Sequence, residues 1–281
     1  MKVAVTGATG FVGSHVLAEL GQRSDVTIVA ASRGRAPASG WPAGVEPVTL
    51  DVGNAGLDAF ERLGRPDIVM HLAWGGLPNY RSLHHFETEL PAQYRFLRAL
   101  VDGGVSRLVV SGTCYEYGMV SGELTESQAA QPSNPYAHAK NALRQQLEYL
   151  RASAGSFGLT WARLFYMYGD GQAPTSLYPQ LMAALRRGDA RFAMSGGEQL
   201  RDFLPVGEVA RLLVDVALAP AAVGTVNICS GTPVSVRSLV EGWVAQSGRE
   251  IALDLGRYPY PDYEPFAFWG SAQRLRQIVR K

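Results

Sequence analysis

Cysteine is scarce in this sequence. Of its 281 residues only Cys114 and Cys229 are cysteines, and they lie far apart in the chain. Two such residues cannot form a disulfide framework, which fits a reducing compartment. Together with five scattered histidines they show no metal-ligand spacing. The one adjacent histidine pair, His84-His85, is expected in a loop or at the surface rather than on a metal.

Strong charge and long apolar runs are also lacking. The formal net charge is +1, which gives no reason to expect nucleic acid or an anionic membrane as a partner. No apolar run approaches the ~20 residues of a membrane-spanning helix. The N-terminal segment MKVAVTGATGFVG lacks the layout of a signal peptide, because its apolar run is short and leads into glycines. We therefore expect a cytoplasmic protein.

The first half alternates short apolar runs with amphipathic stretches. Strands are predicted at Lys2–Thr6, Val26–Ala31, Glu46–Leu50, Ile68–Ala73, Arg107–Ser111 and Leu159–Phe165, and helices at Ser14–Gly21, Ala55–Leu63, Phe86–Val101 and Pro135–Ala154. Continuous apolar strands that alternate with helices are typical of a parallel sheet covered on both faces. Beyond residue 166 helices dominate, at Leu177–Arg187, Gly207–Ala219 and Val236–Gln246, with a short strand at Thr225–Cys229.

A glycine-rich loop follows the first predicted strand and opens the first helix. In Thr6-Gly7-Ala8-Thr9-Gly10-Phe11-Val12-Gly13 the three glycines allow a sharp turn, close approach of a pyrophosphate and close helix–strand packing. The helix N-terminus adds unpaired N–H groups and a positive dipole end. This pattern in this context predicts a dinucleotide site. The alternative is a tight turn without a ligand.

The end of the second strand bears on the choice of dinucleotide. A site for NAD usually has an acid there, to hold the ribose hydroxyls, but this strand ends Ala31-Ser32-Arg33. Ser32 and Arg33 could bind a 2′-phosphate, which favours NADP(H) over NAD(H). Asp51-Val52 is placed to meet the adenine. The alternatives are a solvated Arg33 and a helix-capping Asp51.

Tyr136 and Lys140 are candidate catalytic residues. Four residues apart on a helix, they share one face, and a nearby ammonium lowers the pKa of a phenol toward a useful range. Lysine also has spare donors for a nicotinamide ribose. At the end of the fifth strand Thr113 could hold the same substrate oxygen as Tyr136, with Ser111 as the competing assignment.

These motifs together resemble the extended short-chain dehydrogenases of the NAD-dependent epimerase/dehydratase group. The resemblance spans roughly residues 2–245. It is carried by the segments TGATGFVG, Ser111-Gly112-Thr113…Tyr117-Gly118, YAHAK, His71-Leu72-Ala73, Arg163–Gly169, Arg201-Asp202-Phe203…Val206 and Val226-Asn227-Ile228. Two positions depart from the pattern: Gly207-Glu208 replaces the usual aspartate after RDFxxV, and Glu89 or a neighbour replaces an asparagine.

The resemblance implies a fold and roles for individual residues. The fold is a Rossmann-type doubly wound parallel sheet (1–166) with a smaller C-terminal α/β substrate-binding lobe (167–281) that can cross back to the sheet. Tyr136 would be the general acid/base, Lys140 its partner and ribose ligand, and Thr113 the substrate-orienting hydroxyl. The cofactor would meet Gly7, Thr9, Gly10, Phe11, Val12, Gly13, Ser32, Arg33, Asp51, Val52, Leu72 and Ala73, and the substrate Gln172, Ser176, Leu177 and Arg201, the last on its diphosphate. A homodimer through the Phe86–Val101 and Pro135–Ala154 helices is implied as well.

One of the reactions of this group, dehydration, is disfavoured by the carboxylates that are missing. Dehydratases of this group need an Asp-Glu pair after the catalytic threonine, where this chain has Cys114-Tyr115. Glu116 is one place further and should face elsewhere. The chain resembles nucleotide-sugar 4-ketoreductases, which implies NAD(P)H-dependent reduction of a nucleotide-linked 4-keto-6-deoxyhexose, a dTDP sugar being favoured. The alternatives are a nucleotide-sugar 4-epimerase, a ketoreductase of non-sugar ketones and an NADP-binding protein without chemistry.

Overall fold

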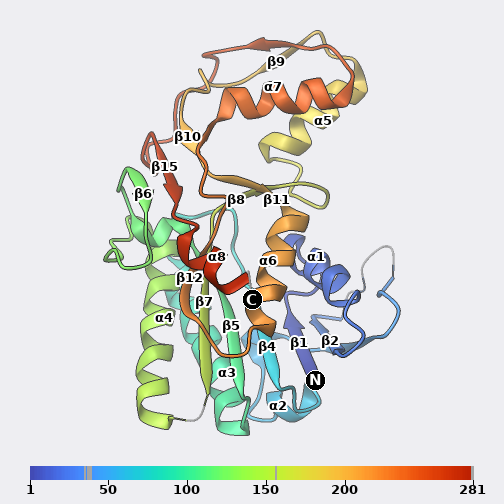
Figure 1. The fold of residues 1–281 in the computed structure, drawn as a ribbon, viewed down its shortest axis with the longest axis vertical. Coiled ribbons are helices and arrows are strands. Elements are labelled where there is room, and N and C mark those ends of the chain that lie inside the picture. The colour runs from blue at the N-terminus through green and yellow to red at the C-terminus, as the bar shows by residue number, and fades with distance from the viewer. Residues whose placement is uncertain (35, 37–39, 156, 280–281) are drawn as a thin grey trace.

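A seven-stranded parallel sheet forms the centre of the computed structural model, which describes residues 1–34, 36, 40–155 and 157–279. The strand order is β12-β7-β5-β4-β1-β2-β3 (Figure 1). The strands are β1 (Lys2–Thr6), β2 (Thr27–Ser32), β3 (Val45–Thr49), β4 (Ile68–His71), β5 (Arg107–Thr113), β7 (Gly158–Leu164) and β12 (Gly224–Ile228). The order reverses between β1 and β4, where Val3 pairs with Ile28 on one side and Ile68 on the other. The predicted Rossmann-type doubly wound sheet is confirmed.

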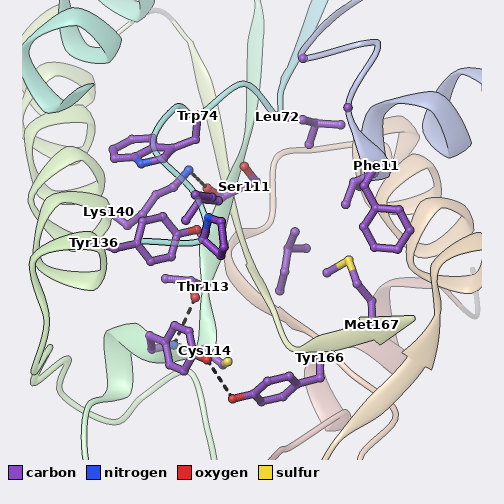
Figure 2. Close-up of a pocket in the computed structure, with 18 of the residues that line it drawn as sticks. Phe11, Leu72, Trp74, Ser111, Thr113, Cys114, Tyr136, Lys140, Tyr166 and Met167 are labelled. Atoms are coloured by element: carbon purple, nitrogen blue, oxygen red, sulfur yellow. Dashed lines mark hydrogen bonds between the residues drawn. The ribbon is translucent and has the colours of Figure 1, made fainter. Parts of the chain in front are cut away.

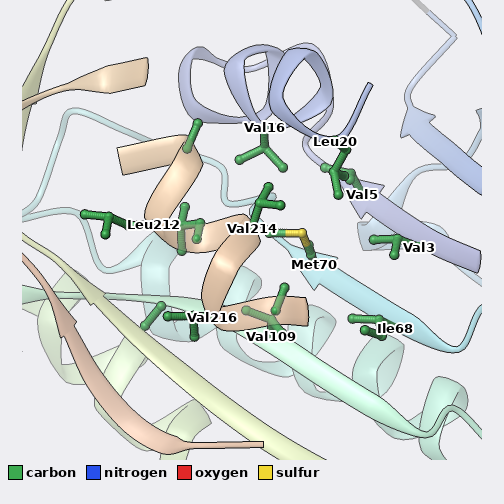
Figure 3. Packing of buried hydrophobic residues seen from close by; sticks show 14 of the residues in the cluster. Val3, Val5, Val16, Leu20, Ile68, Met70, Val109, Leu212, Val214 and Val216 are labelled. Atoms are coloured by element: carbon green, nitrogen blue, oxygen red, sulfur yellow. The ribbon is translucent and has the colours of Figure 1, made fainter. Parts of the chain in front are cut away.

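Helices cover both faces of the sheet, as its apolar strands require. One face carries α1 (Phe11–Leu20), α6 (Val206–Leu218) and α8 (Gln273–Val279). Figure 3 shows Val214 of α6 packed among Val16 of α1, Val5 of β1 and Met70 of β4, all buried. The other face carries α2 (Ala59–Arg62), α3 (Leu90–Gly103) and α4 (Pro135–Ala154). Helix α6 and strand β12 belong to this sheet layer although they lie beyond residue 166. The chain therefore leaves the sheet after β7 and returns to it with α6 and β12.

The rest of the C-terminal half forms a smaller α/β lobe with its own apolar cluster. Helices α5 (Leu177–Arg187) and α7 (Val236–Ser247) pack through Leu181, Leu185, Val240 and Trp243. Short strand pairs complete the lobe and join it to the sheet: β9 (Arg191–Ala193) with β14 (Ala252–Asp254), β10 (Leu200–Arg201) with β13 (Val234–Ser235), β8 (Tyr166–Tyr168) with β11 (Phe203–Pro205), and β6 (Gly122–Leu124) with β15 (Phe268–Gly270). Within the described ranges, no helix combines the length and the apolar character needed to cross a bilayer.

Two predicted helices differ from the structure. The stretch predicted at Ala55–Leu63 is helical only over α2, after a 3-10 turn η1 (Val52–Asn54) that the Asp51 side chain caps. The helix predicted from Phe86 begins with a π-helical turn η2 (His85–Glu89), and α3 starts at Leu90. Pro91 lies in the first turn of α3. Its missing N–H and its ring disrupt a regular α-helical register through this point, which is consistent with the wider turn before it.

Candidate active site

The glycine loop lies at the carboxyl edge of the sheet, where the strand order reverses. Gly7 has a φ of +70°, and the N–H of Gly10 donates to the Gly7 carbonyl at 2.9 Å. A Cβ at Gly13 would lie 2.1 Å from that carbonyl oxygen, so α1 can approach the strand only without a side chain there. The loop has the shape that the sequence predicts, and it places the N-terminus of α1 at the position where this fold binds a pyrophosphate.

Two joined cavities run along this edge, with volumes of about 450 and 280 Å³. They share Gly7, Gly10, Leu72 and Trp74, so together they form one cleft. Every residue predicted to bind the cofactor lines it: Gly7, Thr9, Gly10, Phe11, Val12, Gly13, Ser32, Arg33, Asp51, Val52, Leu72, Ala73, Tyr136 and Lys140. An extended dinucleotide fits this lining, since the glycine loop lies between the two ends.

The end of the cleft beyond β2 carries the side chains that bear on cofactor choice. Ser32 is the last residue of β2, and Arg33 is exposed beside it. Asp51 caps η1 by accepting from the Gly53 N–H at 3.2 Å and from Asn54 Nδ2 at 2.7 Å. The capping alternative for Asp51 therefore holds, and the same residue also lines the cleft.

Glu89 and Gln93 line the same part of the cleft, although no sequence motif drew attention to Gln93. Gln93 Nε2 donates to Glu89 at 2.7 Å, so its Oε1 must accept from His71 Nε2 at 2.6 Å. His71 Nδ1 is then left to accept from the Thr6 hydroxyl at 2.8 Å. Burial, assisted by the charge of Lys140, lowers the pKa of His71 to about 3. The ring is thus neutral and ties the glycine-loop strand to α3.

Helix α4 presents Tyr136 and Lys140 to the other end of the cleft, one turn apart (Figure 2). The helix begins there because the Asn134 side chain caps it, accepting from the Ala137 N–H at 2.9 Å. Lys140 is 1% exposed, and its Nζ donates to the Ser111 carbonyl at 2.8 Å. Burial lowers the pKa of Lys140 to about 7, with Glu116 and Glu89 opposing that change.

Burial also governs Tyr136, whose side chain is nearly enclosed. Desolvation raises its pKa well above the usual 10, Tyr80 adds to the increase, and the Thr113 hydroxyl opposes it. From the sequence, the charge of Lys140 predicts a lowered pKa for Tyr136. The structure differs because removing the phenolate from water outweighs the nearby charge. Tyr136 is a neutral phenol with a proton to give.

The two candidate hydroxyls, Ser111 and Thr113, both lie in β5 and have different partners. The Ser111 hydroxyl donates to the His71 carbonyl at 3.3 Å, which occupies its proton. The Thr113 oxygen accepts from the Tyr115 N–H at 3.3 Å, so its own proton stays available to the cleft. Glu116, the carboxylate nearest to the position of a dehydratase acid, points into the protein. It is fully buried and accepts from the Thr113 N–H, Trp161 and Arg163.

Beyond Thr113 the cleft is walled by apolar and aromatic side chains, namely Leu77, Pro78, Tyr80, Cys114, Tyr115 and Tyr166. Tyr80 packs against Tyr136, with ring centroids 5.5 Å apart. Among the residues that line this larger cavity, Lys140 is the only one with a charged side chain. No sequence pattern points to Tyr80 or Trp74, because an aromatic residue in a loop carries no periodic signal.

The predicted substrate residues divide into two groups. Thr113, Gln172 and Ser176 line the larger cavity, whereas Leu177 packs into the apolar cluster of the C-terminal lobe. Arg201 is 3% exposed and does not line the cleft. Its guanidinium donates to the carbonyls of Leu200 and Phe266 and to Glu264, at 2.8, 2.9 and 2.7 Å. The position of Arg201 does not support its predicted role on the substrate diphosphate, because Glu264 from the C-terminal segment already pairs with its guanidinium.

The histidine pair was predicted to lie in a loop or at the surface, and for His85 this is wrong. His85 is fully buried at the start of η2, where Trp74 Nε1 donates to its Nδ1 at 3.1 Å. His84 is half-exposed, with its Nε2 3.3 Å from Glu89. Within the described residues, no group of three or more histidine, cysteine, aspartate or glutamate side chains could hold a metal ion.

A dinucleotide cleft that ends at a Thr–Tyr–Lys constellation defines an NAD(P)-dependent oxidoreductase. The sequence profile of the NAD dependent epimerase/dehydratase family matches residues 3–229. The chain belongs to this family.

Individual relatives agree with that membership. The dTDP-6-deoxy-L-talose 4-dehydrogenase (NAD(+)) of Aggregatibacter actinomycetemcomitans is 28% identical over 272 residues, covering 96% of this chain and all of the relative. The dTDP-6-deoxy-L-talose 4-dehydrogenase (NAD(P)(+)) of Kitasatospora kifunensis is 30% identical, covering 93% and 83%. Among solved structures, MoeE5 in complex with UDP-glucuronic acid and NAD is 29% identical, with a TM-score of 0.83 over 100% of this chain and 93% of that one.

Proposed function

We propose that this protein reduces the C4 keto group of a nucleotide-linked 4-keto-6-deoxyhexose, with NAD(P)H as reductant. A dTDP sugar is favoured, so that the activity would be of the dTDP-6-deoxy-L-talose 4-dehydrogenase type. The nucleotide rests on the two relatives whose names carry that activity. The same two relatives support a net reduction at C4, whereas the redox chemistry and the 6-deoxy sugar rest on this chain's own residues.

The mechanism assigns one task to each residue of the constellation. Tyr136 gives its proton to the oxygen that forms at C4, and its raised pKa keeps that proton in place until then. The free hydroxyl of Thr113 donates to the same oxygen and polarises the carbonyl. Lys140 would hold the nicotinamide ribose of a bound cofactor. A bound reduced nicotinamide would supply the hydride.

The wall beyond Thr113 is the observation that carries the proposal. A methyl group on C5 of the sugar meets apolar and aromatic side chains there, and loses no hydrogen bond on entering. A hexuronic acid would place a carboxylate against Leu77, Tyr80 and Cys114, where Lys140 is the only charged side chain in the lining. The tyrosine hydroxyls of the wall could donate to such a carboxylate, but no cation would face it there, and burying a charge without an opposite charge lowers affinity. The wall therefore favours a 6-deoxyhexose.

Further assignments belong to the same proposal. Ser32 and Arg33 at the end of β2 favour NADPH over NADH. Gln172 and Ser176 are positioned to meet the nucleotide, while Arg201 has no step because Glu264 holds it. We also infer a cytoplasmic homodimer through the predicted Phe86–Val101 stretch (η2 and α3) and α4, where Phe86 and Tyr149 are exposed by 36% and 77%.

A 4-epimerase is the second candidate, because the UDP-glucose 4-epimerase of Azospirillum brasilense is 30% identical over 98% of this chain and 85% of that protein. An epimerase retains its dinucleotide and returns the hydride, whereas a ketoreductase consumes reductant in each turnover. Net loss of NAD(P)H absorbance on a keto sugar therefore separates the two.

The test measures that absorbance with dTDP-4-keto-6-deoxyhexoses, with NADPH and NADH in parallel, for the wild type and Tyr136→Phe. We expect consumption with NADPH and a decrease of at least about 100-fold in the variant. UDP-glucuronic acid and its 4-keto form serve as the charged controls and should be poor ligands. No consumption of either reductant, with interconversion of a UDP-hexose instead, would establish the epimerase.

A further inference from the structure

Trp74 lies at the junction of the two cavities and against the catalytic lysine. It follows β4 by three residues and lines both parts of the cleft. The Nζ of Lys140 lies 4.1 Å from the centroid of the indole ring, and Figure 2 shows the ring beside Lys140 and Tyr136. The Tyr136 ring meets the indole edge-on, with centroids 6.0 Å apart. One side chain thus contacts both members of the Tyr–Lys pair.

The indole is held by the buried histidine behind it. Trp74 Nε1 donates to His85 Nδ1 at 3.1 Å, so the proton of the neutral ring sits on Nε2, which donates to the Asn79 carbonyl at 2.8 Å. The two ring planes are 28° from parallel, with centroids 6.3 Å apart. Because the indole N–H lies in the ring plane, this hydrogen bond holds the indole by its edge and fixes the direction in which its face points toward Lys140.

The ammonium of Lys140 needs such a contact because it is buried. In the described part of the chain, its one hydrogen bond runs to the Ser111 carbonyl. Two carboxylates, Glu116 and Glu89, favour its charged form. The neighbouring His71 and Tyr136 are neutral and add no charge. An aromatic face attracts a cation most strongly where water is excluded. Of the three ammonium donors, one is given to Ser111 and one faces the indole, which leaves one for the cleft.

We propose that Trp74 is a positioning residue for Lys140: its indole face keeps the ammonium charged inside the protein and directs the remaining N–H toward the bound dinucleotide. The role of that N–H rests on the proposed function, but the contact between ring and ammonium does not. Because burial, opposed by Glu116 and Glu89, lowers the pKa of Lys140 to about 7, a further contribution from the ring face changes how much of the lysine is charged at neutral pH. Trp74 thereby extends the pH range in which the site works.

The pKa of Lys140 can be measured directly, because the sequence contains only three lysines, Lys2, Lys140 and Lys281. Protein labelled with 13C at the lysine ε-carbons gives three signals, and Lys140→Arg identifies the one to follow. The titration uses the unliganded full-length protein, so it stays informative even if the sugar substrate is wrong. Trp74 is replaced by Phe, by Leu and, through codon suppression, by mono- and trifluorotryptophan, which weaken the ring's attraction for a cation while nearly keeping its size.

We expect the pKa of Lys140 to decrease from tryptophan to fluorotryptophan to trifluorotryptophan at position 74. It should fall by about one unit in Trp74→Leu, and Trp74→Phe should lie between the wild type and Trp74→Leu. In the same series the alkaline limb of kcat/KM should move to lower pH in parallel. Trifluorotryptophan at Trp243, whose ring packs against Tyr168 and Tyr178 in the C-terminal lobe, is the matched control and should change neither quantity.

The fluorinated series is decisive even if Trp74→Leu does not fold, because it preserves the packing. A Lys140 pKa that stays constant through the fluorinated series would overturn the proposal. So would equal shifts in the Phe and Leu variants, since packing alone would then account for them. A graded shift at position 74, absent at 243, supports it.

Discussion

Glu116 offers a sharp test of how the catalytic strand is held in place. One of its oxygens, Oε1, accepts from the Thr113 N–H and from Trp161 Nε1, both at 2.9 Å. The other, Oε2, accepts from Arg163 Nε at 2.8 Å. The Glu116 side chain is fully buried and that of Arg163 is 3% exposed. Replacement by glutamine keeps an acceptor at the first oxygen and puts an NH2 group, which cannot accept, against the guanidinium.

The expected cost follows from this division. Glu116→Gln leaves Arg163 buried with an unpaired charge, and breaking a buried ion pair on one side typically costs about 3–5 kcal/mol. The ring of Tyr117, 4.4 Å from the guanidinium, remains to offset a small part. Since whole domains are stable by about 5–15 kcal/mol, the loss is a large fraction of the total. In Glu116→Gln the Thr113 N–H keeps an oxygen acceptor, so Thr113 stays in place. Turnover of the folded variant should therefore fall much less than in Glu116→Leu, which removes both acceptor oxygens.

Urea unfolding of the wild type and the variant measures the difference in free energy. The matched control is Glu208→Gln, which breaks the ion pair of Glu208 with Arg211 at the surface, where the side chains are 38% and 42% exposed. We expect a change of no more than about 1 kcal/mol there. If Glu116→Gln and Glu208→Gln were equally mild, the buried pair would not stabilise the strand as argued.

Three further outcomes are expected. Arg33→Ser should raise KM for NADPH about tenfold or more and leave that for NADH nearly unchanged, because a 2′-phosphate loses its cation; equal effects would reject the assignment. Gly13→Ala should weaken dinucleotide binding at least tenfold in a titration of cofactor fluorescence, because its Cβ would collide with the Gly7 carbonyl. Lys140→Met should change stability with pH. The folded pKa of Lys140 is about 7 against a usual 10.5, so the unfolded chain binds the extra proton between these values and wild-type stability rises with pH there, by up to about 5 kcal/mol. Lys140→Met lacks this rise in stability. Urea unfolding of both proteins near pH 7 and near pH 10 would show the difference.

Local pattern was enough to predict the elements that carry the chemistry. Strand β1 and helices α4 and α5 have the predicted bounds, because a buried strand, a capped helix and a glycine at a helix end each leave their mark within a few residues. The loop between Thr6 and Gly13 and the pair Tyr136–Lys140 could be assigned from the sequence for the same reason. The structure adds that both line a single cleft.

Groups that meet across long stretches of chain could not be found in this way. Arg201 was expected to face a phosphate, yet Glu264, 63 residues later, holds it. Trp74 and Lys140 are 66 residues apart, and no periodicity links them. The raised pKa of Tyr136 also comes from enclosure by side chains from several loops. The sequence by itself determined which residue types are available, the parallel sheet and the glycine loop, because these depend on local backbone and burial patterns. Only the tertiary structure decided which charges are paired, which hydroxyl keeps its proton and which ring faces the lysine, because these depend on desolvation and on contacts between distant segments.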